Sequence, residues 1–322
     1  MKAMVQHVYG GPENLRLEEV DRPIPGEGEV LVAVHAAGVN WADYSILTGV
    51  PYMVRLGFGV RAPRHGIRGT DVSGVVVSSG PGVRDIRPGD EMFGWCKAAF
   101  AEFVSVPGDQ LVAKPEAISF EQAAAVPMAG IVALQALRDI ARLRSGQKVL
   151  VVGASGGIGT FAVQIAKAMG AEVTGVCSTA NVDLVRDIGA DHVIDYTVDD
   201  FTRSEERYDV ILDIADNHSL AARRRVLKPG GTLIPNSGEG NRLVGSLGRI
   251  VGARLFSPFV SQRLRPFLSM ASRDHLEALR DLIESRQVVP VVGRTYPLVE
   301  AAAALDHVGH RHSRGKTVLS IT

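Results

Sequence analysis

The sequence predicts an α/β protein that combines a small β-barrel-like domain with a doubly wound parallel sheet. From residue 1 to about residue 115, short apolar stretches are separated by Gly- and Pro-rich turns, which is typical of a small barrel of short strands. From Lys148 onward, apolar stretches alternate with helical patterns across short connections. That alternation indicates a parallel sheet with helices on both faces.

The barrel-like part consists of short predicted strands that end at glycines and prolines. These strands are expected over 29–39, 72–77, 91–93 and 100–106. Ser119 and Gln122 then have the spacing of a capping box, which marks a change to helices. Two helices are expected, over 119–126 and about 128–142, divided by Pro127.

A turn rich in small residues follows the first strand of the parallel sheet. Lys148–Val152 has the pattern of a buried strand, residues 153–159 that of a tight turn, and apolar residues at helical spacing continue to Met169. A helix N-terminus carries unpaired N–H groups and the positive end of the helix dipole. We therefore expect this turn to bind a phosphate group.

The turn has three remaining interpretations once the short-chain dehydrogenase turn, G-x-x-x-G-x-G over 153–159, is dropped because no tyrosine has a lysine four residues later. The pattern A-x-G-x-x-G over 154–159 is the dinucleotide-binding fingerprint with alanine at its first position. The pattern G-x-S-x-G over 153–157 is that of a hydrolase nucleophile elbow, for which Asp213 and His218 are available. A helix-capping turn without a ligand is the third. We favour the fingerprint, because the elbow leaves Gly159 unexplained and the turn opens a regular βαβ series.

The rest of the chain continues the alternation of strands and helices. Strands are expected over 172–176, 192–194, 208–214, 232–234 and 317–321, and helices over 184–188, 218–227, 274–285 and 298–308. Parallel strands bind ligands at the edge where their carboxyl ends meet. We expect Gly153, Cys177, Asp213 and Asn236 to line that edge.

Composition argues against several kinds of partner. The 322 residues carry 35 basic and 35 acidic side chains, so no net charge recommends nucleic acid or an anionic membrane. The sequence shows no apolar signal or membrane span, and two cysteines are too few for a disulfide framework. We expect a cytoplasmic homodimer that binds a small molecule.

Several short motifs occur in order along nearly the whole chain. They are A-G-V-N-x-x-D-Y at 37–44, G-T-D-x-x-G at 69–74, R-P-G-D-x-x-F-G at 87–94, F-x-x-A-A-x-x-P at 120–127, G-A-S-G-G-I-G at 153–159, G-A-D at 189–191 and N-S-G at 236–238. Together they resemble the medium-chain dehydrogenase/reductase superfamily, in its zinc-free quinone oxidoreductase branch akin to zeta-crystallin. The resemblance implies a GroES-like catalytic domain of residues 1–124, completed by 289–322, a Rossmann nucleotide-binding domain of 125–288, and an active site in the cleft between them.

The zinc-ligand positions of the alcohol dehydrogenase branch hold poor ligands in this chain. Zinc would need a thiolate at Asn40 and a histidine at Thr70, whereas an amide and a hydroxyl bind it weakly. We therefore expect no zinc. Without a Lewis acid an alcohol hydroxyl is not activated. Quinones and α,β-unsaturated carbonyls, which move charge onto a conjugated oxygen, are the better substrates.

The resemblance places Asn40, Tyr44 and Tyr52 beside the nicotinamide, and we take them as the catalytic candidates. A tyrosine can donate a hydrogen bond, or a proton relayed through water, to a developing enolate oxygen. Helix capping by Asn40 or Asp43 is the alternative. A metal at the histidines of 307–312 is disfavoured because no cysteine accompanies them.

Cofactor choice depends on the residues after the second parallel strand. No acid closes that strand, so nothing repels the 2′-phosphate of NADPH, which Ser178, Thr179 and Tyr196 are expected to bind. Ala180 replaces a cation common in related sequences, so the preference over NADH should be modest. The expected cofactor contacts are Ala154, Ser155, Gly156, Gly157, Ile158, Gly159, Ser178, Thr179, Tyr196, Asn236, Ser237 and Lys316, for the last of which an ordinary surface lysine is the alternative.

The sequence thus predicts an NADPH-dependent, zinc-independent oxidoreductase acting on a quinone or an α,β-unsaturated carbonyl, with NADH as a second cofactor. An enoyl or enone reductase in a biosynthetic pathway is the alternative within enzymes. A nucleotide-binding protein with little catalysis is the alternative from another class.

Overall fold

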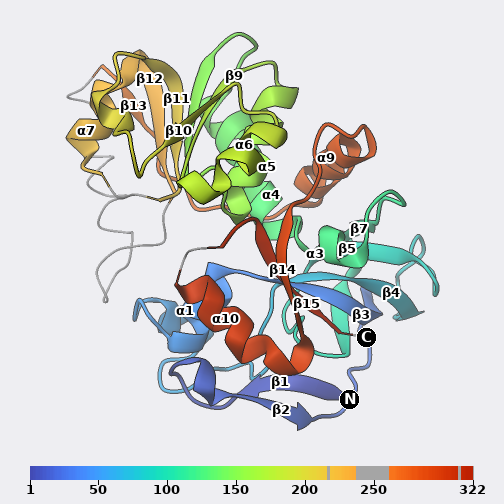
Figure 1. Cartoon of the computed structure of the whole chain (residues 1–322). Coiled ribbons are helices and arrows are strands. Elements are labelled where there is room, and N and C mark those ends of the chain that lie inside the picture. Colours follow the sequence, from blue (N-terminus) through green and yellow to red (C-terminus); the bar gives the residue numbers. More distant parts are fainter. Residues whose placement is uncertain (216–217, 237–260, 311–312, 322) are drawn as a thin grey trace. The chain divides into compact units, whose positions relative to one another are not determined.

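The computed structural model describes residues 1–215, 218–236, 261–310 and 313–321. The chain divides into two compact units (Figure 1). The first contains residues 1–131, 271–284 and 290–322, and the second contains residues 132–270 and 285–289. Within the described ranges, no helix is long and apolar enough to cross a membrane.

The first unit is built on a seven-stranded sheet whose path runs β14-β15-β3-β4-β5-β7, with β6 as a further partner of β3. Its strands are β3 (Glu29–Val39), β4 (Asp71–Ser79), β5 (Glu91–Trp95), β6 (Phe103–Pro107), β7 (Leu111–Ala113), β14 (Val292–Pro297) and β15 (Lys316–Ser320). An antiparallel pair, β1 (Lys2–Gln6) and β2 (Leu15–Glu19), forms a separate small sheet. The helices are α1 (Trp41–Thr48), α2 (Val54–Phe58), α3 (Phe120–Ala124), α9 (Arg273–Glu284) and α10 (Ala301–Gly309).

The long strand β3 joins the parts of this sheet. It pairs along one edge with β4, and its other edge is shared by β6 near its start and β15 near its end. Gly38 is required near that end, because a Cβ would lie 2.4 Å from the carbonyl oxygen of Ala124. The predicted strand over 29–39 is confirmed, and so is the capping box, since Ser119 Oγ accepts from Gln122 N at 3.2 Å.

The second unit is a six-stranded parallel sheet in the order β10-β9-β8-β11-β12-β13. Its strands are β8 (Lys148–Val152), β9 (Glu172–Cys177), β10 (His192–Asp195), β11 (Tyr208–Asp213), β12 (Leu227–Pro235) and β13 (Arg263–Leu264). Its helices are α5 (Gly157–Ala168), α6 (Val182–Asp187) and α7 (Leu220–Arg225), and α4 (Pro127–Leu134) leads into it through a π-helix, Gln135–Ala141. Counted along the chain, the strand order is 3-2-1-4-5-6, so the predicted doubly wound α/β class is confirmed.

The strand predicted over 232–234 begins earlier than expected, at Leu227. Residues 228–231 lie inside β12 instead of before a strand. Leu227 pairs with Tyr208 and Thr232 pairs with Val210, so the four residues between them form an irregularity within one strand. A proline and two glycines in this stretch interrupt the regular pairing, which explains why it has the sequence pattern of a turn.

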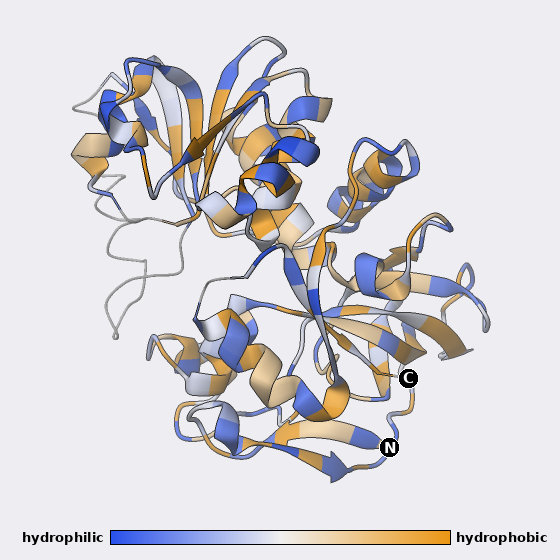
Figure 2. Ribbon diagram, viewed as in Figure 1, coloured by the Kyte–Doolittle hydropathy of each residue, from blue (hydrophilic) through white to orange (hydrophobic). Residues whose placement is uncertain are grey.

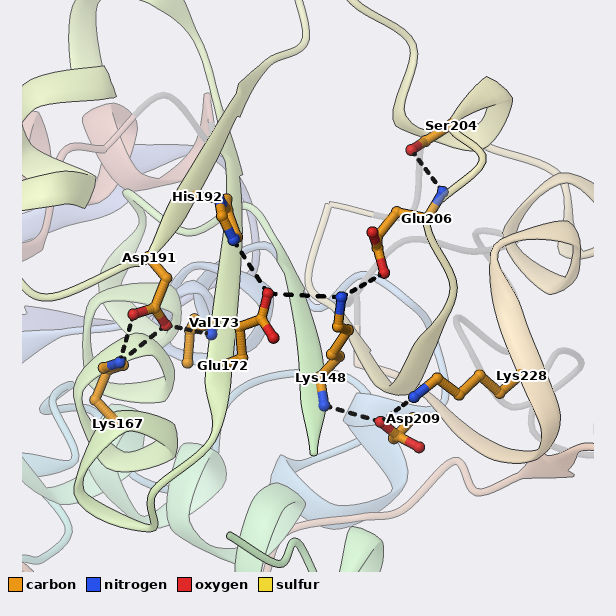
Figure 3. Close-up of polar contacts among 10 residues, drawn as sticks. All are labelled: Lys148, Lys167, Glu172, Val173, Asp191, His192, Ser204, Glu206, Asp209 and Lys228. Atoms are coloured by element: carbon orange, nitrogen blue, oxygen red, sulfur yellow. Dashed lines mark hydrogen bonds and ion pairs between the residues drawn. The ribbon is translucent and has the colours of Figure 1, made fainter. Parts of the chain in front are cut away.

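The two ends of the parallel strands have different surroundings. Figure 2 shows these strands coloured largely as hydrophobic, and the side chains of the central strands β8, β9 and β11 are mostly buried. Charged residues gather at the amino ends (Figure 3): Lys148 Nζ lies 2.7 Å from Glu206 and 3.6 Å from Glu172. The Lys148 backbone N–H also donates to Asp209 at 2.8 Å. The small-residue turn leaves β8 at the opposite, carboxyl edge.

Candidate functional site

The turn after β8 is held against the end of β9 by backbone hydrogen bonds. The N–H groups of Gly153 and Ala154 both donate to the carbonyl of Val176, at 3.1 and 3.0 Å. Gly153 has a φ of +86°, a left-handed conformation that favours glycine. Ala154 is buried and does not have a positive φ, which explains why alanine is accepted at the first fingerprint position.

Two later glycines of the turn serve different purposes. A Cβ on Gly159 would lie 2.1 Å from the carbonyl oxygen of Gly153, so α5 approaches the strand closely only because this residue is glycine. A Cβ on Gly156 would meet only that same oxygen, at an ordinary 3.4 Å. The fold therefore requires Gly159, whereas Gly156 leaves open space at the helix N-terminus.

The N-terminus of α5 is suited to an anion. Gly156 caps the helix without a side-chain hydrogen bond, and the first turn has no acidic residue. Residues 155–158 are partly exposed. Unpaired N–H groups and the helix dipole attract phosphate, and the small side chains let it approach. The turn fits the pyrophosphate of a dinucleotide.

The nucleophile-elbow interpretation disagrees with this geometry. An elbow holds its serine in a strained strand-to-helix turn, but Ser155 does not have a positive φ. Asp213, the acid available to it, is bound by Arg223, whose Nη1 lies 2.6 Å from Asp213 Oδ2. Both side chains are buried, so this ion pair belongs to the interior of the second unit.

The carboxyl ends of the central strands line up as expected. Asp213 pairs in register with Val152 on one side and with Pro235 on the other. Gly153 and Asn236, the next residues along the two outer strands, therefore lie at one edge. Among the residues that the structure describes, Asn236 Nδ2 is buried and makes no hydrogen bond, so it is a donor available at this edge.

The end of β9 gathers the residues predicted to hold a 2′-phosphate. Tyr196 N donates to the carbonyl of Cys177 at 3.0 Å, which brings Tyr196 beside Ser178. The Tyr196 side chain is 50% exposed. Thr179 is also exposed, and its hydroxyl lies 2.8 Å from that of Thr197.

Asp195 is a residue of this corner that the sequence analysis missed. Its Oδ1 accepts from the N and the Oγ1 of Thr197, at 2.9 and 2.7 Å. Hydrogen bonds from Thr179 and Thr197 hold the pKa of Asp195 below its usual range, so the carboxylate is charged. As the sequence predicted, β9 itself ends at Cys177 without an acid, but the adjacent strand β10 places Asp195 opposite Cys177.

In the first unit, strand pairing gathers buried polar residues at one end of β3. Both β4 and β15 run antiparallel to β3, so their first residues flank its last one. The residues concerned are Asp71, Lys316 and, directly after β3, Asn40. They are 0%, 4% and 7% exposed.

Lys316 links these residues. Its Nζ lies 2.5 Å from Asn40 Oδ1 and 3.6 Å from Asp71 Oδ2. Asp71 also accepts from the N–H of Met128 at 3.2 Å, in the first turn of α4, which favours a charged carboxylate. The alternative of an ordinary surface lysine at position 316 is therefore wrong.

Asp43 and Thr70 complete what we call the buried polar cluster, formed by Asn40, Asp43, Thr70, Asp71 and Lys316. Asp43 Oδ2 accepts from Asn40 N at 2.9 Å, which is the helix capping by Asp43 that the sequence left as an alternative. Thr70 Oγ1 lies 3.4 Å from Asp43 Oδ1. Burial, with the charge of Asp71 adding to it, raises the pKa of Asp43 to about 7.

The two tyrosine candidates lie in different surroundings. Tyr52 is 44% exposed, and the guanidinium of Arg55 lies 4.9 Å from its ring. Tyr44 is half-buried against the core of the first unit, where a Cβ on Gly309 would lie 2.6 Å from its ring. Asn40 is thus part of the buried polar cluster, while Tyr52 is accessible.

Two residues of the sequence analysis, Ser237 and His312, lie outside the described residues. His310 has its Nδ1 2.8 Å from the carbonyl of Asp306, a contact within α10. In the ranges that the structure covers, no group of three or more His, Cys, Asp or Glu side chains is arranged to hold a metal ion.

Comparison with known proteins covers both units. Residues 26–116 match the alcohol dehydrogenase GroES-like domain, and residues 188–319 match a family described as zinc-binding dehydrogenase. The mitochondrial NAD(P)H oxidoreductase RTN4IP1 of Mus musculus is 34% identical over 361 residues, covering 100% of this chain and 89% of that protein. The quinone oxidoreductase of Mus musculus is 32% identical over 337 residues, covering 99% and 97%. The structure of Escherichia coli quinone oxidoreductase complexed with NADPH has a TM-score of 0.84 at 26% identity, covering 99% of this chain and 100% of that one.

The chain belongs to the medium-chain dehydrogenase/reductase superfamily. Within the superfamily it lies in the quinone oxidoreductase-like branch, as its motifs predicted, and it is an NAD(P)H-dependent oxidoreductase. The first unit contains the GroES-like domain. The six-stranded sheet of the second unit is the Rossmann sheet of this superfamily.

The zinc implied by one family description does not fit the residues present. Asn40 and Thr70 offer an amide and a hydroxyl, whose Nδ2 and Oγ1 atoms lie 3.3 Å apart. The Asn40 oxygen already accepts from the Lys316 ammonium. Cys96 lies close to Thr70, because its backbone N–H donates to the Thr70 carbonyl at 2.8 Å. Burial raises the pKa of the Cys96 thiol well above the usual range.

The residues that sequence reasoning missed had recognisable signals. Asp71 stands in the motif at 69–74, directly after Thr70. Asp195 directly precedes Tyr196, the predicted phosphate contact. An acid next to a predicted ligand residue is therefore worth testing for both roles.

The two glycines of the turn predict separable effects. Gly156→Val should weaken nicotinamide nucleotide binding at least about tenfold, because its side chain would stand where the pyrophosphate approaches the helix N-terminus. The melting temperature should change little, because the added Cβ meets the fold only at the Gly153 oxygen, at 3.4 Å. Gly159→Ala should lower the melting temperature, because its Cβ meets the Gly153 carbonyl. Fluorescence titration and thermal unfolding measure both. Equal loss of stability in the two variants would contradict the assignment.

The raised pKa of Asp43 predicts a pH dependence of stability. Its pKa is about 7 in the folded protein against 3.8 ordinarily, so between these values the folded protein holds a proton that the unfolded chain has released. The free energy of unfolding therefore falls as the pH rises through this window. Asp43→Asn should remove that slope. Above pH 7 the free energy of unfolding of the variant should therefore exceed that of wild type by on the order of 2 to 4 kcal/mol. Chemical denaturation at several pH values measures it, and parallel curves for the two proteins would argue against it.

Proposed function

We propose that the protein transfers hydride from NADPH to a quinone or an α,β-unsaturated carbonyl without zinc. The observation that carries this proposal is the buried polar cluster, in which an amide and a hydroxyl stand where zinc would need its ligands and an ammonium contacts the amide. Acceptors of this kind take hydride at carbon and place negative charge on a conjugated oxygen. They need a hydrogen-bond or proton donor and no Lewis acid.

The second unit offers a place for each part of the cofactor. Bound NADPH supplies the hydride. The turn over 153–159 would hold the pyrophosphate at the N-terminus of α5. Asn236 Nδ2 is an available donor, and the exposed Thr179 and Tyr196 would contact the 2′-phosphate. Lys316 belongs to the buried polar cluster by its contacts, so we assign it no cofactor contact.

Tyr52 is the better of the two tyrosines as a donor to the acceptor oxygen. Its side chain is 44% exposed, whereas Tyr44 packs against the core of the first unit. Tyr44 would then shape the site without donating.

A substrate panel tests the proposal directly. NADPH oxidation should be rapid with a quinone and with an enone, and absent with a simple ketone. Tyr52→Phe should lower turnover about tenfold or more with little change in the Michaelis constant for NADPH, while Tyr44→Phe serves as the matched control. An enone-only profile would favour an enoyl or enone reductase. Tight NADPH binding without turnover of any acceptor would point to a binding protein.

The corner around Thr179 predicts how the cofactor preference can be changed. A 2′-phosphate bound there would meet the charged Asp195, so wild type should prefer NADPH over NADH only modestly. Asp195→Asn should enlarge the preference roughly two- to fivefold. Ala180→Arg should also enlarge it, because a guanidinium binds phosphate in a fork, and added salt should reduce that gain.

Titration of both nucleotides into wild type and the two variants measures these preferences. Asp199, an exposed acid whose backbone N–H donates to the Asp195 carbonyl at 2.8 Å, provides the control variant Asp199→Asn, which leaves that backbone contact in place. The cofactor assignment would be refuted by wild type binding NADH as tightly as NADPH. If neither variant changes the preference, the 2′-phosphate binds elsewhere.

A further inference from the structure

Lys316 is buried beside two carboxylates that favour its charged form. Its ammonium donates to Asn40 Oδ1 at 2.5 Å and lies 3.4 Å from the carbonyl of Val39. Burial lowers the pKa of Lys316, and the nearby carboxylates of Asp71 and Asp43 oppose that shift. Buried charges persist when they are paired and hydrogen-bonded. The first unit therefore contains a positive charge supplied by its own chain.

The ammonium determines which way the Asn40 amide faces. An ammonium can only donate, so the amide oxygen must face Lys316 and the NH₂ group must face away. Asn40 Nδ2 then donates to Asp71 Oδ2 at 3.0 Å and lies 3.3 Å from Thr70 Oγ1. The amide oxygen and both N–H groups thus have partners.

The direction of donation continues through Thr70. Its hydroxyl accepts from Asn40 and can donate to Asp43 Oδ1 at 3.4 Å. Lys316 therefore orients the Asn40 amide, and the Asn40 amide in turn orients the Thr70 hydroxyl. Without the ammonium, the amide could turn over and present its oxygen to Thr70.

The same arrangement opposes a metal ion. Between Asn40 and Thr70 the chain presents an N–H group, which is a donor and cannot ligate a cation. A divalent ion there would also stand close to the Lys316 ammonium, and like charges repel strongly where water is excluded. The neighbouring carboxylate of Asp71, which would otherwise attract such an ion, already has its counter-charge.

We propose that Lys316 is the built-in cation of this domain: it orients Asn40 and keeps a divalent metal ion from binding between Asn40 and Thr70. Lys316 acts on the site through Asn40 and is a positioning residue. Its role differs from the cofactor contact that the sequence suggested, and it does not depend on which acceptor is reduced.

Cobalt binding tests the exclusion of metal. Asn40→Cys with Thr70→His restores two metal-binding side chains while keeping the lysine, and adding Lys316→Met removes its charge. Cobalt chloride is titrated into each protein, and the d–d and thiolate charge-transfer bands are followed. We expect the triple variant to bind Co²⁺ at least about tenfold more tightly than the double variant. Lys316→Arg in the same background keeps the charge and should bind as weakly as the double variant. Equal affinity in all three proteins would overturn the proposal.

A second measurement keeps the proposal testable if the triple variant does not fold. A cation that balances Asp71 predicts coupling, so Lys316→Met with Asp71→Asn should unfold at higher denaturant than Lys316→Met alone. Additive losses would contradict the pairing. In the single Lys316→Met variant, a positioning role predicts lower turnover with the NADPH dissociation constant within about twofold of wild type. A large rise in that constant at unchanged turnover would show a cofactor contact instead. Cobalt absorption and unfolding need no turnover, so they remain informative if the proposed reaction is wrong.

Discussion

The first unit depends on one constraint, the pairing of β3 with β4 along one edge and with β15 along the other. It brings the first residues of two strands that are far apart in the sequence to the last residue of a third. Because side chains alternate across a sheet, a shift of one residue in either pairing would turn Asp71 or Lys316 away from Asn40. Losing one partner of such a buried charged group typically costs about 3 to 5 kcal/mol. The cluster and the register therefore support each other.

At the carboxyl edge of the Rossmann sheet, the candidate site is formed mainly by backbone groups instead of buried side chains. There the backbone itself makes the site, because Gly159 lets α5 approach β8 and the N–H groups of the helix remain available. The charged residues of that sheet lie at its other edge, around Lys148 and Asp209 (Figure 3). The N-terminus of α5 is thus separated from these carboxylates, while Asp195 and the ion-paired Asp213 are acids that lie at the carboxyl ends of their strands.

The sequence was sufficient for the fold and for the turn because both depend on local patterns. Alternating strands and helices, and the spacing of Gly153, Gly156 and Gly159, appear in any short window of the chain. The structure gave new information where residues meet across long separations. Lys316 has the sequence surroundings of a surface lysine, and only the pairing of β15 with β3 shows that it is buried beside Asn40. Asp195 was missed for the same reason, since its approach to Thr179 depends on the pairing of β10 with β9.

We propose hydride transfer without a metal, because Asn40 accepts from the Lys316 ammonium and turns its NH₂ group toward Thr70. The most direct measurement is the metal content of purified, active protein by mass spectrometry, with NADPH-dependent quinone reduction assayed before and after a strong chelator. We predict no stoichiometric zinc and unchanged activity after chelation. One zinc ion per chain, with activity lost on chelation and restored by zinc, would contradict it.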